Sequence, residues 1–376
     1  MRAGNRLKIL IGTALVLCSV GAGTVTTAEP ALAQARVAGC PTPPAPHTPA
    51  NPAFYDFVNT YRSGCASTRN WDRSFRDSTI RTTIDGRTPV SVTTSTALGA
   101  AIASVKVDRK EYIASGGHGA ALQYNFHAWK AGSSPTECYN PTQAGAHQDD
   151  VDQPPPFHGP STSALYEHRA QGATIRSNSR LAMYMTHDDQ RKGWNGCRAT
   201  DFQPDRSPYT LGLSPYWLRP SVQLAPDHGL GGLDNVIRLS ADLTSEDTLH
   251  ENFDAVLIAY LQRDFSTSFA VDPARGTLAP QNEASQRPTA RCTTDGKHCL
   301  GMYFRPSKMG SAYYYLQTRG PSDYNGGFGE YTTQVTVPAT NVGVGGSTRL
   351  SYEVFLVVGD KERVGGTIRE LARRLA

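Results

Sequence analysis

The stretch from residue 111 to residue 150 reads EYIASGGHGAALQYNFHAWKAGSSPTECYNPTQAGAHQDD, and the rest of the chain is interpreted outward from it. His118 lies between two glycines, and an alternating run from Leu122 to Phe126 predicts a strand. Six of the ten histidines in the chain fall between His118 and His187. Because aromatic, amide and imidazole groups are dense here and aliphatic side chains are sparse, the stretch predicts a polar, ring-lined cleft rather than a hydrophobic core.

Alternating apolar residues on both sides of this stretch predict strands. They occupy 79–84, 90–93, 101–107, 122–126, 174–186, 235–244, 253–269, 301–305, 312–318, 331–337 and 350–358, with a turn at Asp85-Gly86. Helices are predicted only at 53–62 and 367–376, whereas 131–163, 187–232 and much of 270–299 read as irregular. This pattern predicts one all-β domain, residues 75–376, in which two large antiparallel sheets pack face to face between short terminal helices.

Residues 1–35 have the pattern of a secretory signal peptide. Three basic residues precede an apolar run, and small residues up to Ala35 offer a cleavage site, with a cut after Ala33 as the alternative. The apolar run is too short and too rich in glycine to predict a transmembrane helix. Cys18 follows the bulky Leu17, which disfavours a lipid anchor. We therefore expect a secreted protein without a membrane anchor.

Charge and motifs exclude several classes of partner. Removal of residues 1–35 takes away three basic residues and Glu29, so the formal charge falls from +4 to +2. A nearly neutral chain without a basic block disfavours nucleic acid as a partner. The sequence has no phosphate loop, dinucleotide fingerprint, Gly-x-Ser-x-Gly elbow or Cys-x-x-Cys pair, so no cofactor and no metal site are expected. Nothing in it sets the oligomeric state.

Six cysteines follow the predicted signal peptide, and an even number in an exported chain favours disulfides. Several pairings are possible, and the most local choice is Cys40–Cys65, Cys138–Cys197 and Cys292–Cys299. The first of these would tie together residues 36–74, a proline-rich leader followed by the short helix.

Three patches of sequence carry a family resemblance. They are GAAIASV at 99–105, continued by KEYI at 110–113 and GHGAALQ at 117–123; ECYNPTQAG at 137–145; and SYEVFLVVGD at 351–360. Together they resemble secreted bacterial proteins with a galactose-mutarotase-like supersandwich. The resemblance implies that fold over roughly residues 75–375, with a His-Gly turn that leads into a sugar cleft, and it implies a carbohydrate ligand.

The resemblance does not fix a reaction, because that architecture serves epimerases, hydrolases, lyases and non-catalytic modules. The chain also departs from the family pattern. Relatives often have an acid before the His-Gly pair and an arginine after it, where this chain has Gly117 and Ala120. An acid is also common at the position of Gln143. These departures put catalysis through the family's own acids in doubt.

The candidate catalytic residues are groups that transfer protons near neutral pH, namely His118, Tyr139, Asp149, Asp150 and Glu167. Glycines beside His118 would let a ligand approach, and a disulfide beside Tyr139 would hold its phenol. Each has a structural alternative. The histidine can be a turn residue that bonds a carbonyl, the aspartates a solvated acidic loop, and the glutamate an ordinary strand-end charge.

The candidate substrate-binding residues combine rings and hydrogen-bonding groups, namely Gln123, Trp129, Asn140, His147 and Trp217. Aromatic faces stack on the apolar faces of sugar rings. The alternatives are a core position for some of the tryptophans and a turn cap for Asn140.

The function predicted from the sequence is a secreted carbohydrate-active enzyme that cleaves a polysaccharide or oligosaccharide by acid and base catalysis, as a glycoside hydrolase or a lyase. The alternative is a secreted glycan-binding or cell-wall-associated protein without catalysis. A third and weaker hypothesis is a secreted effector or inhibitor that acts through an exposed apolar protein interface.

Overall fold

The computed structural model describes residues 77–114, 121–129, 163–182, 213–245, 252–281, 287–305, 313–319, 330–339 and 348–376. Contacts divide the chain into two units, Met1–Gln34 and Ala35–Ala376, and every described residue belongs to the second unit. The predicted signal peptide, the leader with its helix and four of the six later cysteines lie outside the described residues, so these assignments stay predictions.

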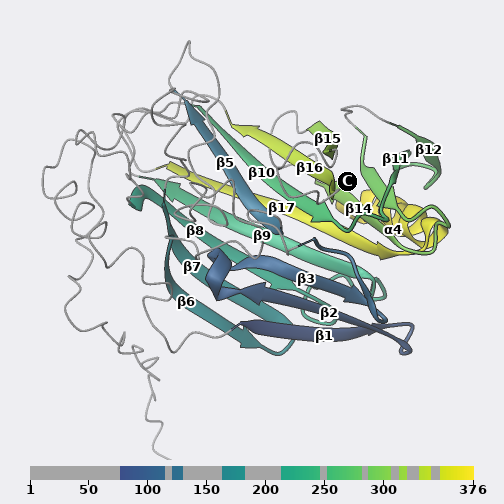
Figure 1. Ribbon diagram of the computed structural model, residues 1–376, viewed down its shortest axis with the longest axis horizontal. Coiled ribbons are helices and arrows are strands. Elements are labelled where there is room, and N and C mark those ends of the chain that lie inside the picture. Colours follow the sequence, from purple (N-terminus) through teal and green to yellow (C-terminus); the bar gives the residue numbers. More distant parts are fainter. Residues whose placement is uncertain are drawn as a thin grey trace, which may run out of the picture. The chain divides into compact units, whose positions relative to one another are not determined.

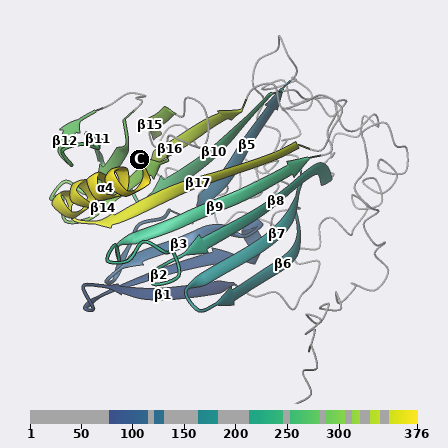
Figure 2. The same cartoon turned by 180° about the vertical axis from the view of Figure 1, so that it is seen from behind.

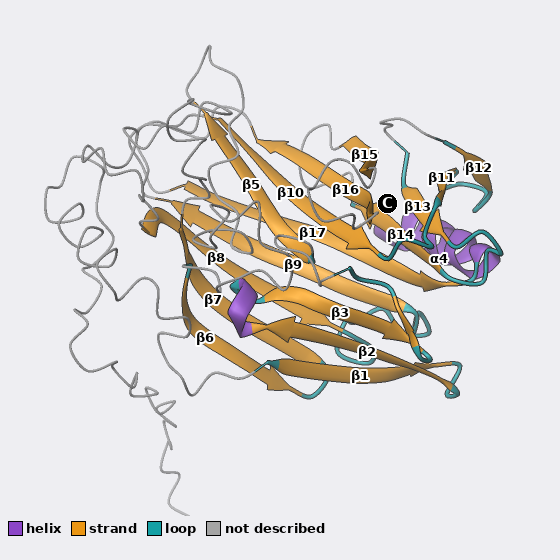
Figure 3. Cartoon of the chain, in the orientation of Figure 1, coloured by secondary structure: helices purple, strands orange, loops and turns teal. Residues whose placement is uncertain are grey.

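The fold is all-β, as the sequence predicts, with two large antiparallel sheets (Figures 1 and 3). The eight-stranded sheet has the order β1-β2-β3-β5-β10-β16-β15, and β4 pairs with β3 at its side. Its strands are β1 (Ser78–Ile84), β2 (Thr88–Ser95), β3 (Ala101–Val107), β4 (Lys110–Glu111), β5 (Leu122–Trp129), β10 (Asn252–Leu261), β15 (Tyr313–Arg319) and β16 (Glu330–Ala339). A short 3-10 helix, η2 (Thr96–Leu98), follows β2. The predicted turn at Asp85-Gly86 joins β1 to β2, with both residues at positive φ.

The nine-stranded sheet has the order β12-β11-β13-β14-β17-β9-β8-β7-β6. Its strands are β6 (Ala164–Gln171), β7 (Thr174–Ala182), β8 (Leu213–Gln223), β9 (Val236–Ser245), β11 (Thr267–Val271), β12 (Leu278–Pro280), β13 (Thr289–Cys292), β14 (Cys299–Phe304) and β17 (Thr348–Gly359). The last strand leads into the helix α4 (Lys361–Leu375).

The main hydrophobic core lies between the two sheets, because a single cluster of buried side chains draws on both. Strand β17 shows how the alternation of a strand divides its side chains between two faces. Val354 and Leu356 belong to the core between the sheets, whereas Phe355 and Val357 pack in a second cluster with residues of α4. Helix α4 therefore covers part of the outer face of the nine-stranded sheet, beside β14 and β17 (Figure 2).

Three sequence predictions about elements are corrected by the structure. Strand β8 forms within 187–232, and β12 and β13 form within 270–299, where irregular chain is predicted; β6 forms at 164–171, where no strand is predicted. Pro215 and Pro220 disguise β8, because proline cannot donate to a sheet ladder and usually argues against an interior strand. The predicted strand 253–269 is two strands, since β10 ends at Leu261 and β11 joins the other sheet.

The C-terminal helix is confirmed, but it begins at Lys361 rather than at residue 367. Its N-cap is Asp360, whose side chain accepts a hydrogen bond from the Arg363 backbone N–H at 2.8 Å. Helix propensity does not predict this earlier start, because Gly365 and Gly366 lie in the first turns and glycine is unfavourable inside helices. Among the described residues, no helix combines the length and apolar character that a membrane span requires.

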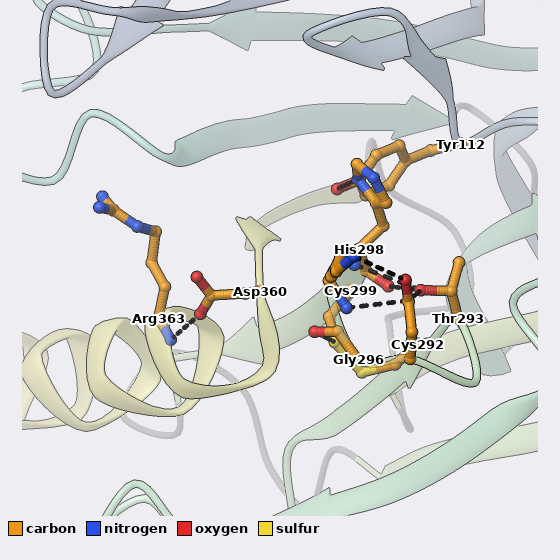
Figure 4. The surroundings of a disulfide bond; sticks show 10 residues. Tyr112, Cys292, Thr293, Gly296, His298, Cys299, Asp360 and Arg363 are labelled. Atoms are coloured by element: carbon orange, nitrogen blue, oxygen red, sulfur yellow. Dashed lines mark hydrogen bonds and ion pairs between the residues drawn. A yellow bond between two sulfur atoms is a disulfide. The ribbon is translucent and has the colours of Figure 1, made fainter.

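The predicted disulfide Cys292–Cys299 is present and joins β13 to β14 across a short turn (Figure 4). Thr293 and His298 continue this pairing, with a hydrogen bond of 2.8 Å from the Thr293 N–H to the His298 carbonyl. The His298 imidazole lies edge-on to Tyr112, whose hydroxyl is 3.4 Å from Nδ1. The bridge therefore fixes a turn of the nine-stranded sheet. This turn contacts the buried Tyr112, which directly follows β4 of the eight-stranded sheet.

Candidate functional site

A groove of about 430 Å³ lies on the outer face of the nine-stranded sheet. Strands β6, β7, β8, β9 and β17 form it, and their alternate residues enter the core on the opposite face. The polar side chains along the groove are Glu167, Arg169, Arg176, Asn178, Arg219, Ser221, Arg238, Ser240, Asp242, Ser351 and Glu353. The groove is thus lined by many polar and charged side chains, with apolar atoms between them.

The strand register arranges these side chains in rows that cross the sheet. One row runs Arg169, Arg176, Ser221, Ser240 and Glu353, each paired with the next on the neighbouring strand. Strands in a sheet are about 4.8 Å apart, so five strands span about 19 Å. The row is long enough to lie along a short oligosaccharide.

A second row lies two residues further along each strand. Glu167 pairs with Asn178, and Arg219 pairs with Asp242, which in turn pairs with Ser351. The flanking pairs of β7 with β8 place Asn178 opposite Arg219, which completes this row across the same five strands. The groove therefore offers two parallel lines of hydrogen-bonding groups.

Each carboxylate of the groove is held by an arginine. Glu353, only 8% exposed, accepts from Arg238 Nε at 2.6 Å, and Arg238 Nη1 donates to the His228 carbonyl at 3.1 Å. Glu167 pairs with Arg169 at 2.9 Å. These contacts fix the orientation of the carboxylates.

Asp242 follows the same pattern. It pairs with Arg349 at 2.9 Å and accepts a hydrogen bond from the Ser351 hydroxyl. All three groove carboxylates are thus engaged in ion pairs.

Two groove arginines have no carboxylate partner among the described residues. Arg176 is exposed and stands directly opposite Arg169, and Arg219 reaches only the Thr244 hydroxyl, at 3.4 Å. Asn178 Oδ1 is buried and has no hydrogen-bond partner in the part of the chain that the structure describes. Within the described residues, the middle of the groove therefore carries positive charge without a carboxylate partner and a hydrogen-bond acceptor without a donor.

Aromatic rings lie at one end of the groove. Trp217 is two residues from Arg219 on β8, so it faces the same side of the sheet, and its neighbours Tyr216 and Leu218 enter the core. The ring of Tyr166 lies 5.0 Å from that of Trp217, and the Arg180 guanidinium lies 5.7 Å from the Trp217 ring. The predicted residues Trp217 and Glu167 thus share one face of one sheet.

One other predicted site residue, Gln123, lies away from this groove. Gln123 lies on β5 of the eight-stranded sheet and is fully buried, and its amide atoms have no partner among the described residues. Trp129 ends β5, where the structure does not describe its side chain. The remaining predicted residues, His118, Tyr139, Asn140, His147, Asp149 and Asp150, lie outside the described residues.

Several of the predicted residues outside the described part are close in sequence to strands that form the groove. Residues 130–162, which include Tyr139, Asp149 and Asp150, join the sheet at β6 only a few residues before Glu167. Residues 183–212 connect β7 to β8, and Ala182 pairs with Leu213 at that same end of the strands. The start of β6, the end of β7 and the start of β8 therefore lie at the end of the groove where Trp217 and Tyr166 are.

His168 belongs to the interior behind the groove. Its Nδ1 lies 2.9 Å from the Ser177 hydroxyl and its Nε2 lies 3.2 Å from the Thr94 hydroxyl of the other sheet. Burial lowers the pKa of His168, and the opposing influence of Asp77 is smaller. This histidine connects the sheets as a neutral ring. No group of histidine, cysteine and acidic residues among those described could hold a metal ion.

The sequence argument missed the arginines and serines of the groove. A signal for them existed in β9, where Arg238, Ser240 and Asp242 alternate with core residues and mark one face as polar and charged. Such a pattern is typical of any solvated sheet face. Only the register of β9 with β6, β7, β8 and β17 shows that the polar side chains of five strands line one groove.

No protein-family model matches the chain, and comparison with curated proteins finds no match. Solved structures do resemble it. A protein from Escherichia coli K12, provisionally assigned as an aldose 1-epimerase, has a TM-score of 0.43 and 11% identity, covering 76% of this chain and 99% of that one. The GalM/aldose epimerase homologue of C. elegans has a TM-score of 0.37 and 8% identity, covering 76% and 99%.

Heparan sulfate lyase HepC from Pedobacter heparinus also resembles the chain, with a TM-score of 0.37 and 8% identity. The match covers 82% of this chain and 40% of that one. The resembling structures therefore include galactose mutarotase-like and aldose epimerase proteins, at identities and TM-scores that do not assign the chain to a family.

Proposed function

We propose that this protein is secreted and acts on an oligosaccharide or polysaccharide that lies in the groove of the nine-stranded sheet, and that it cleaves this chain by acid and base catalysis. The observation that carries the proposal is the pair of polar rows across β6, β7, β8, β9 and β17 next to the rings of Trp217 and Tyr166. A saccharide presents hydroxyls around its edge and apolar C–H groups on its faces, which match these two kinds of surface.

The size and charge of the groove support this class of ligand. Small-molecule sites commonly enclose about 300–1,000 Å³, and the groove, at about 430 Å³, falls in that range. Serines and Asn178 can each donate and accept hydrogen bonds, as sugar hydroxyls can. The arginine-held carboxylates, of which Glu353 is the most buried, are fixed acceptors for such hydroxyls.

Cleavage requires groups that give and take protons at the scissile bond. In the proposal, His118 and Tyr139 do so together with one carboxylate among Asp149, Asp150 and Glu167. Glu167 is the one of these with a described position, on the groove face of β6 with 39% of its side chain exposed. Its ion pair with Arg169 holds the carboxylate in a fixed orientation on that face.

A second candidate function is glycan binding without catalysis. It is favoured because all three groove carboxylates are already engaged by arginines, which leaves no unpaired carboxylate in the described part of the groove. The departures at Gly117, Ala120 and Gln143 from the family pattern point the same way.

The test is a panel of oligosaccharides and polysaccharides with the mature protein, followed by calorimetry for binding, by reducing ends for hydrolysis and by absorbance of unsaturated products for a lyase. The variant Ser240→Trp places a large side chain at the centre of the groove and should abolish binding and turnover. A matched control, Ser91→Trp, puts the same side chain on the outer face of β2 and should leave both unchanged.

The outcomes separate the candidates. Turnover that is lost in Ser240→Trp supports the enzyme, and binding without turnover supports the glycan-binding protein. A folded sample that neither binds nor cleaves any saccharide in the panel contradicts both.

A further inference from the structure

We infer that the groove selects an acidic saccharide, and that Arg176 and Arg219 bind its carboxylate or sulfate group. This inference rests on the proposed function and names its substrate class. The two guanidinium groups lack a carboxylate partner among the described residues, unlike Arg169 and Arg238 in the same groove.

The opposition of Arg169 and Arg176 is the first argument. They are direct cross-strand partners on β6 and β7, both exposed on the same face. Like charges directly opposite each other in a sheet are destabilising. Glu167 compensates Arg169 at 2.9 Å, which leaves the positive charge of Arg176 uncompensated by the described residues. A bound anion would remove this electrostatic cost.

The position of Arg219 is the second argument. Arg176 pairs with Ser221, and Arg219 lies two residues before Ser221 on the same face, so the two arginines are diagonal neighbours. Diagonal positions are about 7–8 Å apart at the backbone, a separation across which two long guanidinium side chains can converge on one group. Arginine presents paired N–H donors that match the planar oxygens of a carboxylate or the oxygens of a sulfate.

Neighbouring polar groups complete the binding environment. The Ser221 hydroxyl lies beside Arg176 in the first row, and Asn178, which lies opposite Arg219, has a buried Oδ1 without a partner among the described residues. An acidic sugar has ring hydroxyls next to its charged group. The serine and the amide can bond those hydroxyls while the arginines bind the anion.

The groups that oppose an anion are also defined. Glu167 is the diagonal neighbour of Arg176 on β6, and Asp242 is the direct partner of Arg219 on β9. Arg169 and Arg349 engage these two carboxylates through ion pairs of 2.9 Å each. Counting these four arginine and acid side chains with Arg176 and Arg219, the centre of the groove has an excess of two positive charges.

The experiment measures binding by calorimetry at low salt for three oligosaccharides of matched length. These are an oligogalacturonide, the same compound with its carboxylates methyl-esterified, and a sulfated galactan oligosaccharide. Each is titrated into the mature protein and into Arg176→Gln, Arg219→Gln and the control Arg81→Gln. Arg81 is an exposed arginine of β1, so the control removes the same charge away from the groove.

We expect Arg176→Gln and Arg219→Gln each to weaken binding of an acidic oligosaccharide about tenfold or more, because each variant removes charge-assisted hydrogen bonds to the anion. Binding of the neutral ester should change less than twofold, and Arg81→Gln should change neither. Thermal melting of Arg176→Gln should be unchanged or slightly higher, because the variant relieves the repulsion with Arg169. Preference for the uronate or for the sulfate identifies which acidic group the site takes.

Two results would overturn the inference while leaving the proposed function in place. One is equal affinity for the acid and its ester, and the other is an equal loss for both in the arginine variants. If no saccharide of any charge binds to the folded protein, the proposed function fails as well.

Discussion

Arg238 on β9 and Glu353 on β17 form an ion pair on the floor of the groove, with Arg238 Nη2 2.5 Å from Glu353 Oε1. The residues are not direct cross-strand partners, because Glu353 pairs with Ser240, two residues along β9. Arg238 also donates to the carbonyl of His228, in the turn that precedes β9. The Arg238 guanidinium therefore connects the floor of the groove to the turn between β8 and β9.

We expect the two partners of this ion pair to contribute unequally to the free energy of unfolding. Arg238→Gln leaves a carboxylate that is only 8% exposed without its cation, and we expect the free energy of unfolding to fall by roughly 2–3 kcal/mol. Glu353→Gln leaves an arginine that is partly exposed and still bonded to the His228 carbonyl, so a loss of about 1 kcal/mol is expected. Urea denaturation of the two variants at pH 7 measures both. A larger loss for Glu353→Gln would contradict this account.

A second prediction concerns acid sensitivity at His228. This ring is buried, its Nδ1 accepts the Leu230 N–H at 3.0 Å, and its Nε2 donates to the Leu233 carbonyl at 2.9 Å. Burial lowers its pKa below the ordinary value of 6.5, and protonation of Nδ1 would also break the bond from Leu230. The folded state therefore favours the neutral ring.

Because the unfolded chain then binds the proton more tightly, stability is full above about pH 6.5 and falls as the pH drops below it. The slope for one histidine is at most about 1.4 kcal/mol per pH unit. His168, whose pKa is lowered in the same direction, adds to it. Urea midpoints measured between pH 7.5 and 5 should decline in the native protein and decline less in His228→Gln. An unchanged slope in the variant would show that His228 does not titrate in this range.

A third prediction uses two adjacent glycines of α4. A Cβ on Gly365 would lie 2.0 Å from the carbonyl oxygen of Gly276, in the turn after β11, whereas a Cβ on Gly366 would meet nothing within 4 Å. Gly365→Ala must push the helix from that turn, and we expect a cost of roughly 2–3 kcal/mol. Gly366→Ala should stabilise by about 0.5–1 kcal/mol, because alanine favours a helix interior. Thermal melting of both variants checks the opposite signs, and destabilisation by both would mean that the helix does not pack on this turn.

A fourth prediction concerns the bridge between Cys292 and Cys299. It closes a short loop, with a sequence separation of 7, and restricts the unfolded chain. We expect the double variant Cys292→Ala/Cys299→Ala to lose about 2–3 kcal/mol. Denaturation under non-reducing conditions, with the other cysteines untouched, measures this loss. Full native stability in the double variant would show that the strand pairing of β13 with β14 holds the turn without the bridge.

The sequence predicted the fold better than it predicted the site, for physical reasons. Alternation alone identifies strands such as β3, because every second residue must be apolar to reach the core. It failed for β8, where Pro215 and Pro220 interrupt the usual strand composition, and for 253–269, where nothing local shows that the chain changes sheets after Leu261.

The groove depends on long-range register, which local patterns do not carry. Arg176, Ser221 and Glu353 are far apart in sequence and meet only because four pairs of adjacent strands align in one register. Trp217 and Glu167 were predicted from their residue types and do lie on this face. The candidate catalytic residues His118 and Tyr139 lie outside the described residues, so their role stays a prediction.

The central claim is that a saccharide lies across the outer face of the nine-stranded sheet. A crystal structure of the mature protein with a bound oligosaccharide tests it most directly. The account predicts sugar density over Ser221 and Ser240, with one end near Trp217 and hydrogen bonds to the two polar rows. Density only on the outer face of the eight-stranded sheet, away from this groove, would contradict it.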